Sequence, residues 1–175
     1  MLTILAISGS LRKASINTSL LRAVVRLAPA DIKVALYRGL GELPLFNPDI
    51  ESPEPAPVAD LRQQIVAADA VLIASPEYAH GVTGVMKNAL DWMVGNESFV
   101  YKPVALLNAS PRASHAQAAL RETLVTMSAR ILEPACITLP LLGAGIDEDG
   151  IVDHPQIRLQ ILTVLDAINA ACAAA

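Results

Sequence analysis

Several features are scarce in this 175-residue sequence, and each scarcity excludes a class of protein. Its two cysteines, Cys136 and Cys172, lie far apart and form no metal-binding pair. The net charge of -4 argues against a nucleic-acid partner, which requires a basic surface. No apolar run approaches the ~20 residues of a membrane span, and no signal-like segment is present. We expect a soluble, cytoplasmic protein with reduced thiols, Cys136 buried and Cys172 near a fraying terminus, and no membrane contact.

The common nucleotide-binding fingerprints are also absent from residues 8–18, which we call the first loop. A dinucleotide fingerprint, G-x-G-x-x-G, would need glycine where Leu11 and Ala14 stand, and a triphosphate loop would end in G-K-[ST]. The first loop has polar side chains instead: Ser10, Arg12, Ser15, Asn17 and Thr18. At the start of a helix such donors suit a terminal monophosphate, because free N–H groups and the helix dipole favour an anion. In the alternative interpretation, Ser15 or Asn17 only caps the helix.

Apolar residues make up 53% of the chain, which excludes disorder and indicates a sheet that is covered on both faces. Apolar runs predict five strands: 2–7, 32–36, 70–74, 103–108 and 135–139. Helical patterns predict five helices: from 16 to just before Pro29, 58–68, 82–93, 113–131 and 157–171. This alternation predicts a flavodoxin-like three-layer α/β sandwich, with a five-stranded parallel sheet in the order 2-1-3-4-5 and helices on both faces. We predict one domain over residues 1–175.

A proline-rich segment, residues 38–57, interrupts the alternation after the second strand. It contains five prolines and four acidic residues, and prolines at this density exclude helix interior and sheet ladder. Two interpretations are open: a solvated connection, or a loop that covers a site or a partner subunit.

Three loops should meet where the strand order reverses, because ligands of open α/β sheets bind beyond the carboxyl ends of the strands. They are the first loop, the second loop (residues 75–84) and the third loop (residues 109–115). Pro76, Gly81 and Gly84 fix a backbone path on which main-chain groups can contact a planar heterocycle; plain turn chemistry is the alternative. Residues 147–150 (Asp-Glu-Asp-Gly) lack the alternation of a calcium loop, so we predict a polar turn and no metal site.

Several segments together carry a family resemblance. They are Gly9-Ser10-Leu11-Arg12 with Ser15 and Asn17, then Ser75-Pro76-Glu77-Tyr78, then Gly84-Val85-Met86-Lys87-Asn88-Ala89-Leu90-Asp91-Trp92, with Asn47-Pro48-Asp49 between. In this α/β pattern they resemble the NADPH-dependent FMN reductases, a family that includes bacterial quinone, chromate and azo-dye reductases. The resemblance covers nearly the whole chain and implies a flavodoxin-like fold that binds FMN without a covalent bond.

The resemblance also implies a set of cofactor-binding residues. By matching positions, Ser10, Arg12, Ser15 and Asn17 would hold the FMN phosphate, with Thr18 as an addition. The ring of the flavin would lie against the second loop, at Pro76, Glu77, Tyr78 and Ala79, largely through main-chain groups, and Ser110 would contact it from the third loop. The chain departs from the family at two places: Ala79 replaces a frequent Asn, and the third loop lacks the usual glycines, with Gln117 where an Arg would fall.

The implied activity is an FMN-dependent oxidoreductase that passes a hydride from NADPH or NADH through FMN to quinones or similar small acceptors, in ping-pong fashion. The flavin performs the chemistry, so we assign no catalytic residue. Low aromatic content (3%) fits an open ring face rather than an electron-carrier flavodoxin. The alternatives are a non-enzymatic flavin-binding electron carrier or redox sensor, and a protein that has lost the cofactor. The family implies a homodimer or homotetramer.

Overall fold

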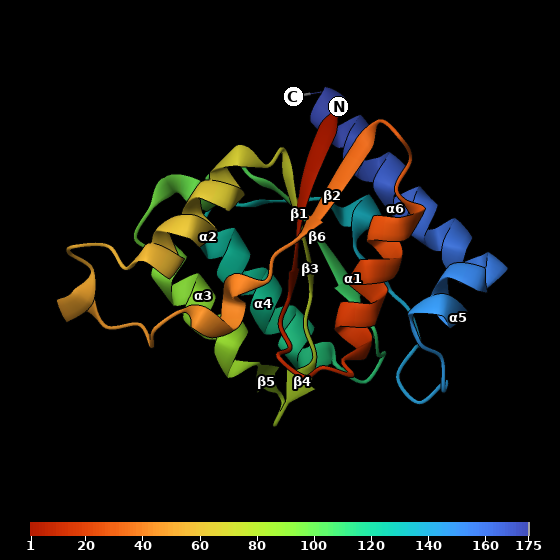
Figure 1. Ribbon diagram of the computed structural model, residues 1–175, viewed down its shortest axis with the longest axis horizontal. Helices are drawn as coiled ribbons and strands as arrows, with labels where there is room; N and C mark the ends of the chain where they lie inside the picture. The colour runs from red at the N-terminus through yellow and green to blue at the C-terminus, as the bar shows by residue number, and fades with distance from the viewer. Residues whose placement is uncertain (175) are drawn as a thin grey trace.

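Strand β1 (Leu2–Ser8) lies between β2 (Ile32–Leu36) and β3 (Ala70–Ala74) and pairs with both in parallel. Strand β6 (Pro103–Asn108) continues the parallel sheet beyond β3. The computed structural model, which describes residues 1–174, places this sheet between two layers of helices (Figure 1). Because these strands run in one direction, their carboxyl ends meet at a single edge of the sheet.

Side chains of the central strands alternate between two hydrophobic cores. Along β1, Ile4 and Ala6 belong to one core, whereas Leu5 and Ile7 belong to the other. β3 and β6 alternate in the same way, and nearly all of their side chains are buried. This double burial explains why the three strands read as continuous apolar runs in the sequence.

Two sets of helices cover the two faces, as Figure 1 shows. One face carries α1 (Ile16–Leu27), α5 (Glu148–Asp153) and α6 (Pro155–Ala173). The other carries α2 (Ala56–Ala67), α3 (Gly84–Met93) and α4 (Ser114–Thr126). Each set buries its apolar stripe against one core, so the α/β sandwich with helices on both faces is confirmed.

The prediction of five strands was wrong, because the sheet has six, in the order β2-β1-β3-β6-β7 with β8 also paired to β6. The expected strand 135–139 is replaced by two short pieces, β7 (Arg130–Ile131) and β8 (Ile137–Thr138), both parallel to β6. A 3₁₀ turn over Glu133–Ala135 separates them. Pro134 within this turn cannot donate to a ladder, so the edge of the sheet is broken at that point.

Several element boundaries also differ from the sequence prediction. The helix expected over 113–131 ends at Thr126, and the one expected over 82–93 begins at Gly84, because Gly81–Val82 form strand β5 of a small hairpin with β4 (Glu77–Tyr78). The polar turn expected at 147–150 instead begins α5, which Asp147 caps by accepting from the Gly150 N–H at 3.0 Å. Cys136 is partly exposed rather than buried, and both cysteines are free.

The proline-rich segment is anchored to α3. It contains two short 3₁₀ turns, Gly39–Glu42 and Pro48–Ile50. The carbonyl oxygen of Pro44 accepts hydrogen bonds from Asn88 Nδ2 at 2.9 Å and from Trp92 Nε1 at 2.8 Å. Trp92 thus orients this segment through its indole N–H.

Candidate functional site at the carboxyl edge of the sheet

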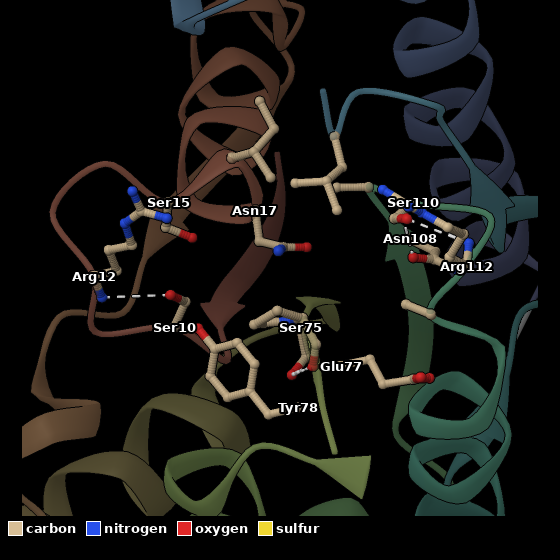
Figure 2. Close-up of a pocket in the computed structure, with 15 residues that line it drawn as sticks. Ser10, Arg12, Ser15, Asn17, Ser75, Glu77, Tyr78, Asn108, Ser110 and Arg112 are labelled. Carbon is tan, nitrogen blue, oxygen red and sulfur yellow. Dashed lines mark hydrogen bonds between the residues drawn. The ribbon is translucent and has the colours of Figure 1, made fainter. Parts of the chain in front are cut away.

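A cavity of about 270 Å³ lies at the carboxyl ends of β1, β3 and β6. The three loops that follow these strands enclose it, together with the first turn of α1 and Leu142 from the segment after β8 (Figure 2). This is the place where the strand order reverses, and where open α/β sheets bind ligands.

The first loop passes unusually close to the second. A Cβ added at Gly9 would lie 2.1 Å from Ser75 Oγ, so only glycine fits there. The Gly9 N–H donates to the Ala74 carbonyl at 2.9 Å, and the Gly9 carbonyl accepts from Thr83 Oγ1 at 2.7 Å. Thr83 is 3% exposed and also caps α3 by accepting from the Met86 N–H. The two loops are therefore held in register by one buried hydroxyl.

The start of α1 presents polar groups to the cavity. Ser15 is the N-cap and accepts from the Thr18 N–H at 3.3 Å. Asn17 is 5% exposed, points into the cavity in Figure 2, and its Oδ1 has no hydrogen-bond partner. A buried amide without a partner is costly, unless a ligand supplies the missing bond. Since its amide can rotate by half a turn, Asn17 can offer either a donor or an acceptor.

The second loop turns through two residues in the left-handed region, Ala79 at φ 50° and His80 at φ 58°. Tyr78 pairs with Gly81 on either side of this turn, which makes it a two-residue hairpin between β4 and β5. Such turns require positive φ at both central positions and favour Asn-Gly. The Asn that is frequent in the family at the position of Ala79 is therefore explained by the positive φ that this turn requires.

Glu77 holds the second loop against α4. Its Oε2 accepts from the Ala116 N–H at 2.8 Å, in the first turn of a helix whose N-cap residue makes no side-chain bond. Its Oε1 lies 3.2 Å from His80 Nδ1, and the His80 ring packs edge-on against His115 with centroids 4.6 Å apart. The Ala116 N–H, and after it His115 and His80, lower the pKa of the Glu77 carboxyl. Glu77 is thus an ionised cap at neutral pH.

The third loop is closed by side chains rather than by glycines. Asn108 Oδ1 accepts from the Ser110 N–H at 3.0 Å, and Ser110 Oγ accepts from the Arg112 N–H at 3.2 Å. These two turns hold the chain beside the cavity without left-handed residues. Gln117 lies on α4 and does not line the cavity.

Most residues predicted for the site lie together. Eight of them line the cavity: Ser10, Arg12, Ser15, Asn17, Pro76, Glu77, Tyr78 and Ser110. Thr18 and Ala79 do not line it. The Thr18 hydroxyl bonds Ser8 Oγ at 2.7 Å instead, and Ala79 lies in the hairpin turn.

The sequence prediction missed other lining residues, notably Ser75, Asn108 and Leu142, and it left Arg112 only as a weak candidate. Ser75 and Asn108 are the first polar residues at the ends of β3 and β6, and that position was the signal that could have identified them. Leu142 follows an edge strand whose boundaries were wrong, so no sequence pattern pointed to it.

The described residues, 1–174, contain no cluster of His, Cys, Asp or Glu that could hold a metal ion. In the acidic run at 147–150, Glu148 and Asp149 both pair with Arg26. Within the same range, none of the helices has the length and hydropathy needed to cross a membrane.

Comparison with known proteins gives one consistent family. A family model described as NADPH-dependent FMN reductase matches residues 2–140. An NAD(P)H-dependent FMN reductase of Pseudomonas aeruginosa is 34% identical over 95% of this chain and 92% of its own length. A quinone reductase of Escherichia coli K12 is 34% identical over 75% of this chain and 73% of its own. The flavoenzyme NAD(P)H:acceptor oxidoreductase of Paracoccus denitrificans has a similar structure, with a TM-score of 0.80 and 28% identity over 97% of this chain and 98% of that one.

Proposed function

This chain belongs to the NADPH-dependent FMN reductase family, and from that premise we propose that its cavity holds FMN and reduces quinone-type acceptors in a ping-pong cycle. The family and its relatives identify an NAD(P)H-dependent flavin enzyme that uses FMN as cofactor. The residues that hold FMN, the alternation of substrates and the assembly are our proposals. Asn17 is the observation that carries the assignment of the FMN site, because its buried amide oxygen has no partner and the side chain points into the cavity.

The first loop fits the phosphate end of FMN. Ser10 and Arg12 line the cavity beside the N-terminus of α1, where free N–H groups and the helix dipole favour an anion. The Asn17 amide would complete its hydrogen bonding on the phosphate. The guanidinium of Arg12 would add charge-assisted bonds, which are stronger than neutral ones.

The second and third loops fit the ring end. Pro76 and Tyr78 line the cavity, while the Glu77 carboxylate is committed to α4. Main-chain groups of these loops would therefore contact the flavin, as the family resemblance implies. Tyr78 is 58% exposed at the cavity rim, so this side stays open to substrates.

FMN held in this cavity would supply the redox chemistry that links the reduced nicotinamide to the acceptor. The residues around it orient both substrates and supply electrostatics. The lowered pKa of Glu77 makes it a poor proton donor at neutral pH, and we assign no catalytic side chain. Because one open face serves both substrates, they would bind in turn, and this gives ping-pong kinetics. A cytoplasmic location, which would suit an enzyme that uses a reduced nicotinamide, is part of the same proposal.

We further propose that the enzyme works as a homodimer or homotetramer. Large apolar side chains are exposed on the proline-rich segment and just after α3, with Leu45 83% and Val94 57% exposed. Exposed apolar side chains of this size are typical of surfaces that a partner covers. Light scattering coupled to gel filtration should give a mass of two or four chains, and a monomer at micromolar concentration would contradict this part of the proposal.

The decisive experiment for the site uses Asn17→Ala. We expect FMN affinity to fall by about tenfold or more, as for loss of a bond to a charged group. The FMN-free variant should melt no lower than the parent, since the Asn17 Oδ1 has no protein partner to lose. Ser19→Ala, two residues along the same helix and outside the cavity, is the matched control. Unchanged FMN affinity in Asn17→Ala would show that the phosphate is held elsewhere.

The activity is tested with the FMN-loaded protein, NADPH and benzoquinone. We expect rapid NADPH oxidation and parallel lines in double-reciprocal plots. If bound flavin were never reduced by NADPH or NADH, the protein would be an electron carrier or sensor instead. Failure to bind FMN at all would favour a protein that has lost the cofactor.

A further inference from the structure

A second hollow lies next to the cavity, and we call it the cationic groove. It has a volume of about 260 Å³, lies beyond the carboxyl end of β2, and shares Ser10 and Arg12 with the cavity. Besides Arg12, its lining includes Lys13, Arg22 from α1 and Arg38. Four cations thus line one hollow in a chain whose net charge is -4.

These four cations have no internal counter-charge. No carboxylate lines the groove, and none of the four forms an ion pair within residues 1–174. Other cations of the chain do pair with carboxylates: Arg26, Arg62, Lys87 and Arg121. Three acids lie near the groove without lining it. Glu148, in an adjoining hollow, is engaged by Arg26 at 3.3 Å. Asp60 and Glu42 lie on the side of Tyr37, whose pKa they help to raise after burial, the main cause. The groove therefore retains its positive field.

The groove also has a hydroxyl pair in its lining, Ser8 Oγ and Thr18 Oγ1, 2.7 Å apart. One of the two hydroxyl hydrogens makes this bond, so the other remains available to an acceptor. Ser8 is 8% exposed, and its hydroxyl has no other partner among the described residues. Cations around a hydroxyl donor match a phosphate monoester in charge and in hydrogen bonding.

The position of the groove suggests which phosphate it takes. In dinucleotide-binding α/β folds, an acid near the adenosine ribose binds the 2′-hydroxyl of NAD, whereas an Arg there accommodates a 2′-phosphate. Here Arg38 stands two residues beyond the end of β2. The groove adjoins the proposed FMN site, so a nicotinamide that reaches the flavin could extend toward it.

We propose that the cationic groove binds the 2′-phosphate of NADPH and makes the enzyme prefer NADPH over NADH. This inference depends on the proposed function, since it assumes that a reduced nicotinamide enters the adjoining cavity. Arg22 and Arg38 supply the discrimination, because Arg12 also belongs to the FMN site. The guanidinium fork suits a phosphate better than an ammonium does.

Calorimetry of NADP⁺ and NAD⁺ on the FMN-loaded protein tests the inference without turnover, because the two ligands differ only in the 2′-phosphate. We expect NADP⁺ to bind at least about tenfold tighter in the parent. In Arg22→Ala/Arg38→Ala this difference in affinity should disappear. Arg158→Ala should preserve it, because Arg158 is exposed, lies outside both hollows and has no ion pair within residues 1–174. Equal affinities in the parent would overturn the inference. So would an equal loss for both ligands in the double variant, which would assign the groove to a phosphate that they share.

Steady-state kinetics separate this inference from the proposed function. We expect the double variant to raise the KM for NADPH toward that for NADH, and rising ionic strength to shrink the preference of the parent in the same way. If the parent reduced benzoquinone with equal kcat/KM for both nicotinamides, the groove assignment would fail and the flavin activity would stand. If neither nicotinamide were oxidised, the proposed function would fail, while calorimetry would still decide what the groove binds.

Discussion

The first and second loops line the same cavity in different ways, the first mainly with side chains and the second mainly with a fixed backbone. The first loop offers side chains to the lining, namely Ser10, Arg12 and, in the first turn of α1, Asn17. In the second loop, the Glu77 side chain is bound to α4, and the turn beyond Tyr78 is formed by left-handed residues. A phosphate needs several donors and positive charge, which side chains supply, whereas a planar ring needs a rigid surface, which a fixed backbone supplies. Substitutions in the first loop should therefore change the groups that can bind a ligand, whereas substitutions in the second loop should change the shape of its backbone.

The largest effect should come from Thr83→Val, which breaks the link between the two loops. It removes the bond to the Gly9 carbonyl and the cap of α3, and it leaves a buried carbonyl unpaired. We expect the free energy of unfolding to fall by about 3 kcal/mol and FMN affinity to fall with it. Urea denaturation and flavin fluorescence would measure the two. Thr83→Ser keeps both bonds and is the control, so equal losses in Ser and Val variants would contradict the role of the hydroxyl.

Gly9→Ala should come next, because it forces the two loops apart. The new Cβ would meet Ser75 Oγ at 2.1 Å and Ser75 Cβ at 2.6 Å. Overpacking of this kind destabilises by about 1–3 kcal/mol, and the displaced Ser75 would narrow the cavity. Thermal melts and FMN titration should both detect it. Ser75→Gly in the same chain removes the clashing atoms, so a double variant no more stable than Gly9→Ala would argue against the close approach.

Glu77→Gln should loosen the second loop alone. We expect FMN to bind about threefold to thirtyfold more weakly, as for the loss of a helix cap, with the first loop intact. The pH dependence has a defined sign. The folded-state pKa of Glu77 lies below its unfolded value, so its stabilisation is present at neutral pH and is lost as pH falls through that lowered value.

The parent and Glu77→Gln should therefore differ in melting temperature at pH 7 and converge on acidification from about pH 4.3 downward. Glu122→Gln, an exposed acid on α4 with no ion pair within the described residues, controls for charge alone. A gap that does not narrow at all as the pH falls would mean that the Gln side chain, rather than the lost charge, causes the defect.

The parts of this molecule that could be predicted from sequence are those that local pattern determines. β1, β3 and β6 are buried on both faces, so their apolar runs placed them almost to the residue. The residues that we propose for the phosphate follow a strand directly, and their donor groups are visible in the sequence. In contrast, the Glu77 bond to Ala116 spans 39 residues and depends on how the second loop meets α4. The broken edge at β7 and β8 depends on two-residue pairings with β6 that have no periodicity to detect.

The smallest effect should come from Ala79→Asn, which tests whether backbone geometry alone governs the second loop. Ala79 has φ 50°, where a Cβ is strained, and Asn tolerates this region better than Ala. We expect a gain of about 0.5–1 kcal/mol in unfolding free energy, with FMN affinity unchanged, because Ala79 does not line the cavity. Ala119→Asn, within α4, should lose stability by a similar amount, since Asn is a weaker helix former than Ala. If Ala79→Asn instead changed FMN affinity, the second loop would also use side-chain chemistry, and the contrast with the first loop would be one of degree.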